Sequence, residues 1–150
     1  MEHNNNIEKG NLYNRLMPFF WTSKQALTIA LLWMLAILLL TGLPGNSFPK
    51  VSKWMDVFQP DKLIHIAMFF PFAWFWLIYF YKIKTPKVRA LFIISFFGIV
   101  YASLTEVLQH YVFIGRNANI PDAIADIIGV LIGVLTFSII RNKWILNKKL

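Results

Sequence analysis

Long apolar stretches, separated by short polar segments, make up most of the chain. Four of them span about 19–20 residues each, at 25–43, 63–81, 90–108 and 121–140. An α-helix rises about 1.5 Å per residue, so each stretch is long enough to cross the roughly 30 Å hydrocarbon core of a bilayer. The pattern predicts an all-α fold, namely a polytopic membrane protein with four transmembrane helices in a compact bundle.

The four spans leave no room for a separate soluble domain. We expect a cytoplasmic or interfacial N-terminal segment over residues 1–24, one membrane domain over residues 25–140, and a basic cytoplasmic tail over residues 141–150. The first apolar stretch is long for the core of a signal peptide, and Thr41-Gly42-Leu43-Pro44 is a poor cleavage site. It is therefore interpreted as a retained span.

Composition agrees with a membrane protein. Hydrophobic residues make up 57% of the chain and charged residues only 15%, against about 25% charged residues in average soluble proteins. Cysteine is absent, which excludes a disulfide framework and a thiolate site.

The net charge of +8 is distributed unevenly along the chain. If the N-terminus, the 82–89 loop and the C-terminus share one side, that side holds 11 of the 15 Lys and Arg residues and the other side holds 4. Cytoplasmic segments carry the excess of Lys and Arg in membrane proteins. We therefore expect both termini in the cytoplasm (N-in/C-in) and interpret the basic balance as a topology signal, so no nucleic-acid partner is expected.

Ionisable residues interrupt the apolar pattern at one depth. His65 and Asp126 lie about one helical turn after the starts of the second and fourth spans, and Glu106 lies about one turn before the end of the third. An ionisable group at the bilayer centre costs about 2.5–3.5 kcal/mol on insertion scales. Three at matching depth favour a functional cluster at the outer leaflet over packing alone. We predict that they approach one another closely, and they are the candidate catalytic residues.

Other polar residues near this depth have simpler alternatives. Asp61 follows a proline and could serve only as a helix cap, Lys62 is favoured to extend to lipid headgroups, and Asp122 could complement the helix dipole. Arg116 could pair with Glu106 or Asp122, or bind a phosphate or carboxylate through two hydrogen bonds. The candidate substrate-binding residues are Asp61, Lys62, Gln109, Arg116 and Asp122.

Two chemistries suit these residue types. His65, Glu106 and Asp126 would suit a divalent ion, although their spacing matches no tight metal-ligand motif. His65 with a carboxylate partner could serve acid–base hydrolysis. No serine or threonine occupies an obvious nucleophile position, which argues against covalent catalysis, and no glycine-rich phosphate loop is present. The sequence identifies neither a metal nor another cofactor.

At these residues the chain resembles the VanZ-like family of small integral membrane proteins. The matching elements, in order within residues 25–140, are Asp61-Lys62-x-x-His65, Glu106-x-x-Gln109, Arg116 and Asp122-x-x-x-Asp126-x-x-Gly129-x-x-x-Gly133. Each motif is weak alone, whereas their order and spacing together are fairly specific. Asp126 departs from the family pattern, since Asn is expected there in many members, and the extra acid favours a protonated carboxyl or a bound cation.

The resemblance implies an association with the cell envelope and a place in the bacterial plasma membrane. The family's name comes from a protein that gives resistance to the glycopeptide teicoplanin. Our leading hypothesis is a polar outer-leaflet site that recognises or modifies an envelope component, such as a lipid-linked headgroup or a glycan precursor, with membrane lipids as its surroundings.

The hypothesis assigns a role to each part of the site. Arg116 would bind an anionic group, and His65 with Glu106 would exchange protons or hydrogen bonds. Asp122 and Asp126 would orient the ligand or hold a cation. The alternative is a non-catalytic structural or scaffold protein whose polar cluster only locks helix packing. An ion-coupled transporter is disfavoured because the inner halves of the spans lack ionisable residues.

Overall fold

The computed structural model describes residues 22–43, 60–112 and 119–147, and the regular structure within these ranges is helical. The helices are α2 (Ser23–Thr41), α3 (Pro60–Lys82), α4 (Lys87–Tyr111) and α5 (Ile120–Asn147). All four are long and apolar enough to cross a membrane. The predicted all-α architecture with four membrane-spanning helices is confirmed, whereas the orientation of the termini stays a prediction.

Two helix ends differ from the expected ones. α3 begins at Pro60, because the fixed φ of proline suits the first helical position and its missing N–H would have no partner there. Asp61 therefore lies inside the first turn, near the positive end of the helix dipole, and is not the N-cap. α5 continues to Asn147, so much of the expected tail is helical. Residues 141–147 contain no glycine or proline that would end the helix earlier.

A tight turn joins α3 to α4. The N–H of Thr85 donates to the carbonyl of Phe80, and the N–H of Lys84 donates to that of Tyr81. This is the hydrogen-bond pattern of a Schellman motif, which usually places glycine in the left-handed conformation. Lys84 adopts that conformation here, with a φ of 59°. The turn reverses the chain, so that the end of α3 and the start of α4 lie together.

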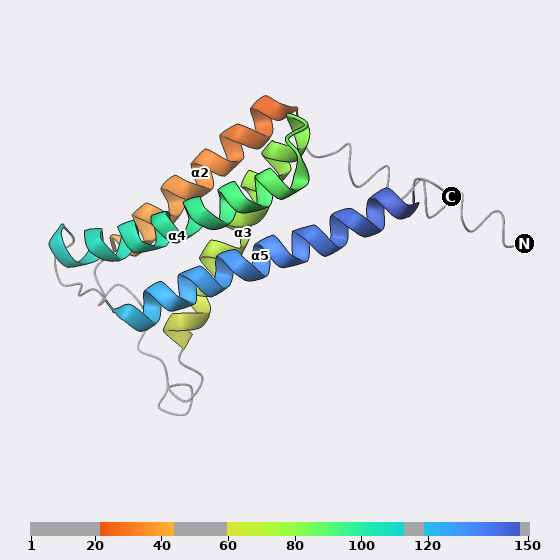
Figure 1. Ribbon diagram of the computed structural model, residues 1–150. Coiled ribbons are helices and arrows are strands. Elements are labelled where there is room, and N and C mark those ends of the chain that lie inside the picture. The colour runs from red at the N-terminus through yellow and green to blue at the C-terminus, as the bar shows by residue number, and fades with distance from the viewer. Residues whose placement is uncertain (1–21, 44–59, 113–118, 148–150) are drawn as a thin grey trace, which may run out of the picture.

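α3 is the central helix, because it packs against each of the other three and most extensively against α5. Figure 1 shows α2 and α5 on opposite sides of the bundle, with α3 passing behind and between them. The core contains stacked aromatic rings: Phe72 lies 5.3 Å from Tyr101 and 5.9 Å from Phe97, measured between ring centres. These contacts tie the middle of α3 to the middle of α4.

Gly129 and Gly133 allow α5 to approach the backbone of α3. A Cβ atom at Gly129 would lie 2.7 Å from the carbonyl oxygen of Ile66, and one at Gly133 would lie 2.8 Å from that of Phe70. Both distances are shorter than a real contact, so the spacing of these helices requires glycine. Ala125, one turn earlier, is also buried. Gly129 and Gly133, four residues apart, therefore lie in the α3–α5 contact, as is common for small residues between membrane helices.

The outside of the bundle is apolar. Many large hydrophobic side chains are exposed along all four helices, among them Leu32, Leu39, Phe92, Leu104 and Leu135. Some polar side chains inside the bundle find partners on neighbouring helices, as when Trp33 Nε1 donates to the carbonyl of Met68 over 2.8 Å. Helices with an apolar exterior are the arrangement that a bilayer imposes.

Candidate functional site

The ends of the four helices bring the polar residues to one end of the bundle. His65 lies in the second turn of α3 and Asp126 in the second turn of α5, and His65 Nδ1 lies 2.9 Å from Asp126 Oδ1. Both side chains are buried, Asp126 completely. An ionised carboxylate only accepts hydrogen bonds, so His65 Nδ1–H is the donor when Asp126 is ionised. The pair joins α3 to α5 at the same end as the small-residue contact.

Glu106 connects the end of α4 to the start of α5. Its Oε2 accepts a hydrogen bond of 2.9 Å from the backbone N–H of Asn119. Asn119 immediately precedes α5, and its carbonyl accepts the first helical bonds, from the N–H groups of Asp122 and Ala123. The carboxylate therefore satisfies a backbone donor at the point where α5 begins.

Five residues form what we call the acidic cluster: Asp61, His65, Glu106, Asp122 and Asp126. One potential ligand atom from each of His65, Glu106 and Asp126 lies within 4.8 Å of those of the other two, and the same holds for Asp61, His65 and Asp122. His65 belongs to both groups and is the centre of the cluster. Asp61 is exposed, whereas the other four side chains are buried, so the cluster has an exposed rim and a buried interior. The predicted approach of His65, Glu106 and Asp126 is confirmed, while their roles stay a prediction.

Three carboxylate oxygens of the cluster have no hydrogen-bond partner among the residues that the structure describes. They are Glu106 Oε1, Asp122 Oδ1 and Asp126 Oδ2, and each is buried. Glu106, Asp122 and Asp126 are only 6%, 7% and 0% exposed. Buried polar atoms almost always have partners, and one without a partner calls for an explanation. Three such acceptors in one cluster indicate a place where a donor or a cation binds.

Two further candidate residues behave differently from the acids. Gln109 is buried, and its Nε2 donates to the backbone carbonyl of Thr41 over 3.3 Å, so its amide connects α4 to α2. Lys62 is half-buried and forms no hydrogen bond or ion pair with the part of the chain that the structure describes. Arg116 lies outside the described residues.

Sequence reasoning missed the partners of Glu106 and Gln109. Those partners are the backbone N–H of Asn119 and the backbone carbonyl of Thr41. Every residue except proline carries both groups, so no residue type could have identified these positions. The apolar context of Thr41 gave no signal either, although its hydroxyl is buried and donates to the carbonyl of Ile37.

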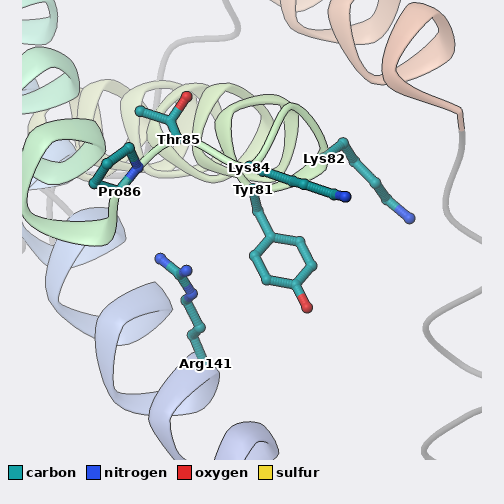
Figure 2. Close-up of a pocket in the computed structure, with 6 residues that line it drawn as sticks. All are labelled: Tyr81, Lys82, Lys84, Thr85, Pro86 and Arg141. Carbon is teal, nitrogen blue, oxygen red and sulfur yellow. The ribbon is translucent and has the colours of Figure 1, made fainter.

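The opposite end of the bundle is basic. A cavity of about 460 Å³ there is lined by Tyr81, Lys82, Lys84, Thr85, Pro86 and Arg141. Figure 2 shows Arg141 extending from α5 toward the turn between α3 and α4, and its guanidinium carbon lies 5.1 Å from the centre of the Tyr81 ring. Cations at one end and acids at the other agree with the expected orientation, in which the basic end faces the cytoplasm.

Comparison with known proteins places the chain in a family. No curated protein and no solved structure matches it significantly. The model of the VanZ/LLP1 family matches residues 3–141, which include all four membrane-spanning helices and the whole acidic cluster. This family is linked by its name to teicoplanin resistance. The chain is therefore a multi-pass membrane protein that belongs to the VanZ/LLP1 family.

Proposed function

We propose that the acidic cluster binds the polar headgroup of a cell-envelope component, specifically a lipid-linked glycan or glycan precursor. The observation that carries the proposal is the set of three buried carboxylate oxygens, on Glu106, Asp122 and Asp126, that have no partner within the described ranges. Sugar hydroxyls and the N–H groups of acetylated amino sugars are donors, and carboxylates accept several hydrogen bonds each. A glycan headgroup would supply the donors that these oxygens lack.

The position of the cluster suits a ligand with a lipid tail. His65, Glu106 and Asp126 lie about one and a half turns from the helix ends, close to where a bilayer's hydrocarbon core meets its headgroup layer. The helix faces beside them are apolar, with Ile64, Val107 and Ile124 exposed. A lipid-linked ligand could place its tail along these faces and its headgroup at the rim near Asp61. This assignment puts the cluster at the outer leaflet of the bacterial plasma membrane.

The contacts of each residue suggest its role in binding the headgroup. His65 and Glu106 each keep a bond within the protein and would exchange further hydrogen bonds or protons with the ligand. Asp122, whose side chain has no hydrogen bond to a described residue, would orient the headgroup. Arg116 would bind an anionic group such as a phosphate of the lipid linkage. The altered handling of an envelope precursor would then connect the protein to glycopeptide susceptibility.

A packing role is the second candidate, and specific contacts favour it. His65 with Asp126 joins α3 to α5, and Glu106 with Asn119 joins α4 to the start of α5. A cluster that only locks helices would need these two bonds. It would not need Asp122, whose buried carboxylate forms no hydrogen bond with the part of the chain that the structure describes. A substitution of Asp122 therefore distinguishes the headgroup-binding role from the packing role.

The test compares Asp122→Asn with the wild-type protein and with the control variant His110→Gln. His110 is exposed and lies in the last turn of α4, at the same end of the bundle as Asp122. Binding of a polyprenyl-diphosphate-linked disaccharide to purified protein is measured by native mass spectrometry, with polyprenyl phosphate as the sugar-free control. We expect wild type and His110→Gln to prefer the glycan lipid and Asp122→Asn to lose that preference. Equal binding of both lipids by the wild-type protein would contradict the proposal, and so would unchanged preference in Asp122→Asn.

A further inference from the structure

The acidic cluster has more negative groups than positive ones to balance them. Glu106, Asp122 and Asp126 are at least nine-tenths buried, and the only ion pair that one of them forms within the described ranges is with His65. An isolated ionised carboxylate is costly to bury, so a buried one is paired, binds a metal or takes up a proton. Three of their oxygens also lack hydrogen-bond donors among the described residues, so the described part of the cluster is short of positive charge as well as of donors.

The ligand atoms of the cluster lie close enough together to approach one metal ion. Nitrogen and oxygen ligands of Zn²⁺ lie about 2.1 Å from the ion, so two of them are about 3.4 Å apart in a tetrahedral site. His65 Nδ1 and Asp126 Oδ1 are 2.9 Å apart. One ligand atom each from His65, Glu106 and Asp126 lies within 4.8 Å of the others. Any pair of these atoms that lies near the 4.8 Å limit would have to move closer for all three to bind one ion.

We propose that His65, Glu106 and Asp126 bind a single divalent transition-metal cation, of the class represented by Zn²⁺ and Mn²⁺. One imidazole and two carboxylates are borderline and hard ligands, which suit these ions, and the absence of cysteine disfavours Cu(I). The ligands come from α3, α4 and α5, so the cation would also hold these three helices together. Asp122, within 4.8 Å of His65 by its ligand atoms, would orient the imidazole from outside the coordination sphere.

The metal site rests on the proposed function for the identity of the lipid ligand. It extends that function, because a bound cation would allow an acidic pocket to accept an anionic lipid. Without one, the carboxylates would repel the phosphate of a lipid-linked glycan. Three protein ligands leave coordination positions open, as in metal sites that also bind a substrate. The open positions would face Asp61 at the exposed rim of the cluster.

The experiment uses the full-length protein, purified in detergent, treated with EDTA and then incubated with Zn²⁺ or with Mn²⁺ in the absence of any glycan lipid. After desalting, the metal content is measured by mass spectrometry and the affinity by calorimetric titration. We expect about one equivalent of metal per chain. His65→Gln and Asp126→Asn should each weaken binding by at least about tenfold, and Asp122→Asn by less. His110→Gln is the matched histidine control and should bind as the wild type does.

Two results would overturn the proposal: a wild-type protein that retains neither ion, or a His65→Gln variant that binds as well as His110→Gln. If the variants fail to fold, electron paramagnetic resonance of Mn²⁺ bound to the wild-type protein tests whether His65 is a ligand. An imidazole ligand gives nitrogen couplings in the spectrum, and their absence would exclude His65. Glycan-lipid binding measured in EDTA separates the two proposals. Binding that persists there supports the proposed function without a cation, while the metal titration in the absence of lipid decides whether the metal site exists.

Discussion

His65 Nδ1 lies 2.9 Å from Asp126 Oδ1, although the two residues are 61 positions apart in the chain. The contact forms because Gly129, less than one turn after Asp126, rests directly on the backbone of α3 at Ile66. Close backbone approach and polar pairing therefore occur at the same level of the α3–α5 contact. The packing of these helices positions the cluster, and the cluster in turn fixes their register.

The His65–Asp126 pair should contribute measurable coupling between α3 and α5. We predict that His65→Gln and Asp126→Asn each destabilise the protein, and that a double-mutant cycle in EDTA gives a coupling free energy of about 1 kcal/mol, between the average of about 0.6 and the maximum of about 1.7 found for membrane hydrogen bonds. Unfolding in detergent supplies the free energies. Strictly additive single-variant effects would show that the two side chains do not interact.

Alanine substitutions at two glycines should show which helix contact involves the backbone and which involves a side chain. A Cβ atom at Gly129 would meet the α3 backbone, whereas one at Gly98 would lie 2.6 Å from a side-chain methyl group of Val130. We predict that Gly129→Ala and Gly98→Ala each cost about 1–3 kcal/mol of stability through overpacking.

Only at Gly98 does the new Cβ meet a side chain, which a second substitution can shorten. Val130→Ala should restore part of the stability of Gly98→Ala, measured by thermal unfolding in detergent, because it removes the methyl groups that the new Cβ would meet. It should not help Gly129→Ala, whose obstacle is a carbonyl oxygen. Rescue of both variants, or of neither, would contradict the packing that the structure shows.

The acidic and basic ends should lie on opposite sides of the membrane. The chain has no cysteine, so single cysteines report position without further changes. Tyr111→Cys lies at the exposed end of α4, and Lys84→Cys lies in the α3–α4 turn. We predict that an impermeant maleimide labels Tyr111→Cys in intact cells and Lys84→Cys only after permeabilisation, in agreement with cytoplasmic termini. The reverse pattern would move the acidic cluster to the inner leaflet.

The four-helix bundle and the approach of the three central residues of the acidic cluster were predictable from the sequence, because both depend on side-chain type. A run of about twenty apolar residues can satisfy its backbone only as a helix in a bilayer, and a common depth was enough to bring His65, Glu106 and Asp126 together. The contacts of Glu106 with Asn119 and of Gln109 with Thr41 were not predictable, because the partner is a backbone group in each case. The continuation of α5 past residue 140 was missed for a related reason. An apolar run marks where a helix meets lipid and not where the helix ends.

Glu106→Gln should abolish function while leaving stability nearly unchanged. The Gln amide oxygen can still accept the N–H of Asn119, which bonds to Glu106 Oε2 over 2.9 Å, but the charge and the acid–base capacity of the carboxylate are lost. We expect a melting temperature in detergent close to that of the wild type, normal accumulation in the membrane, and no complementation of a deletion strain scored by glycopeptide susceptibility or envelope-lipid composition. Complementation at the wild-type level would show that Glu106 serves only to hold α4 against the start of α5, and would favour the packing role for the whole acidic cluster.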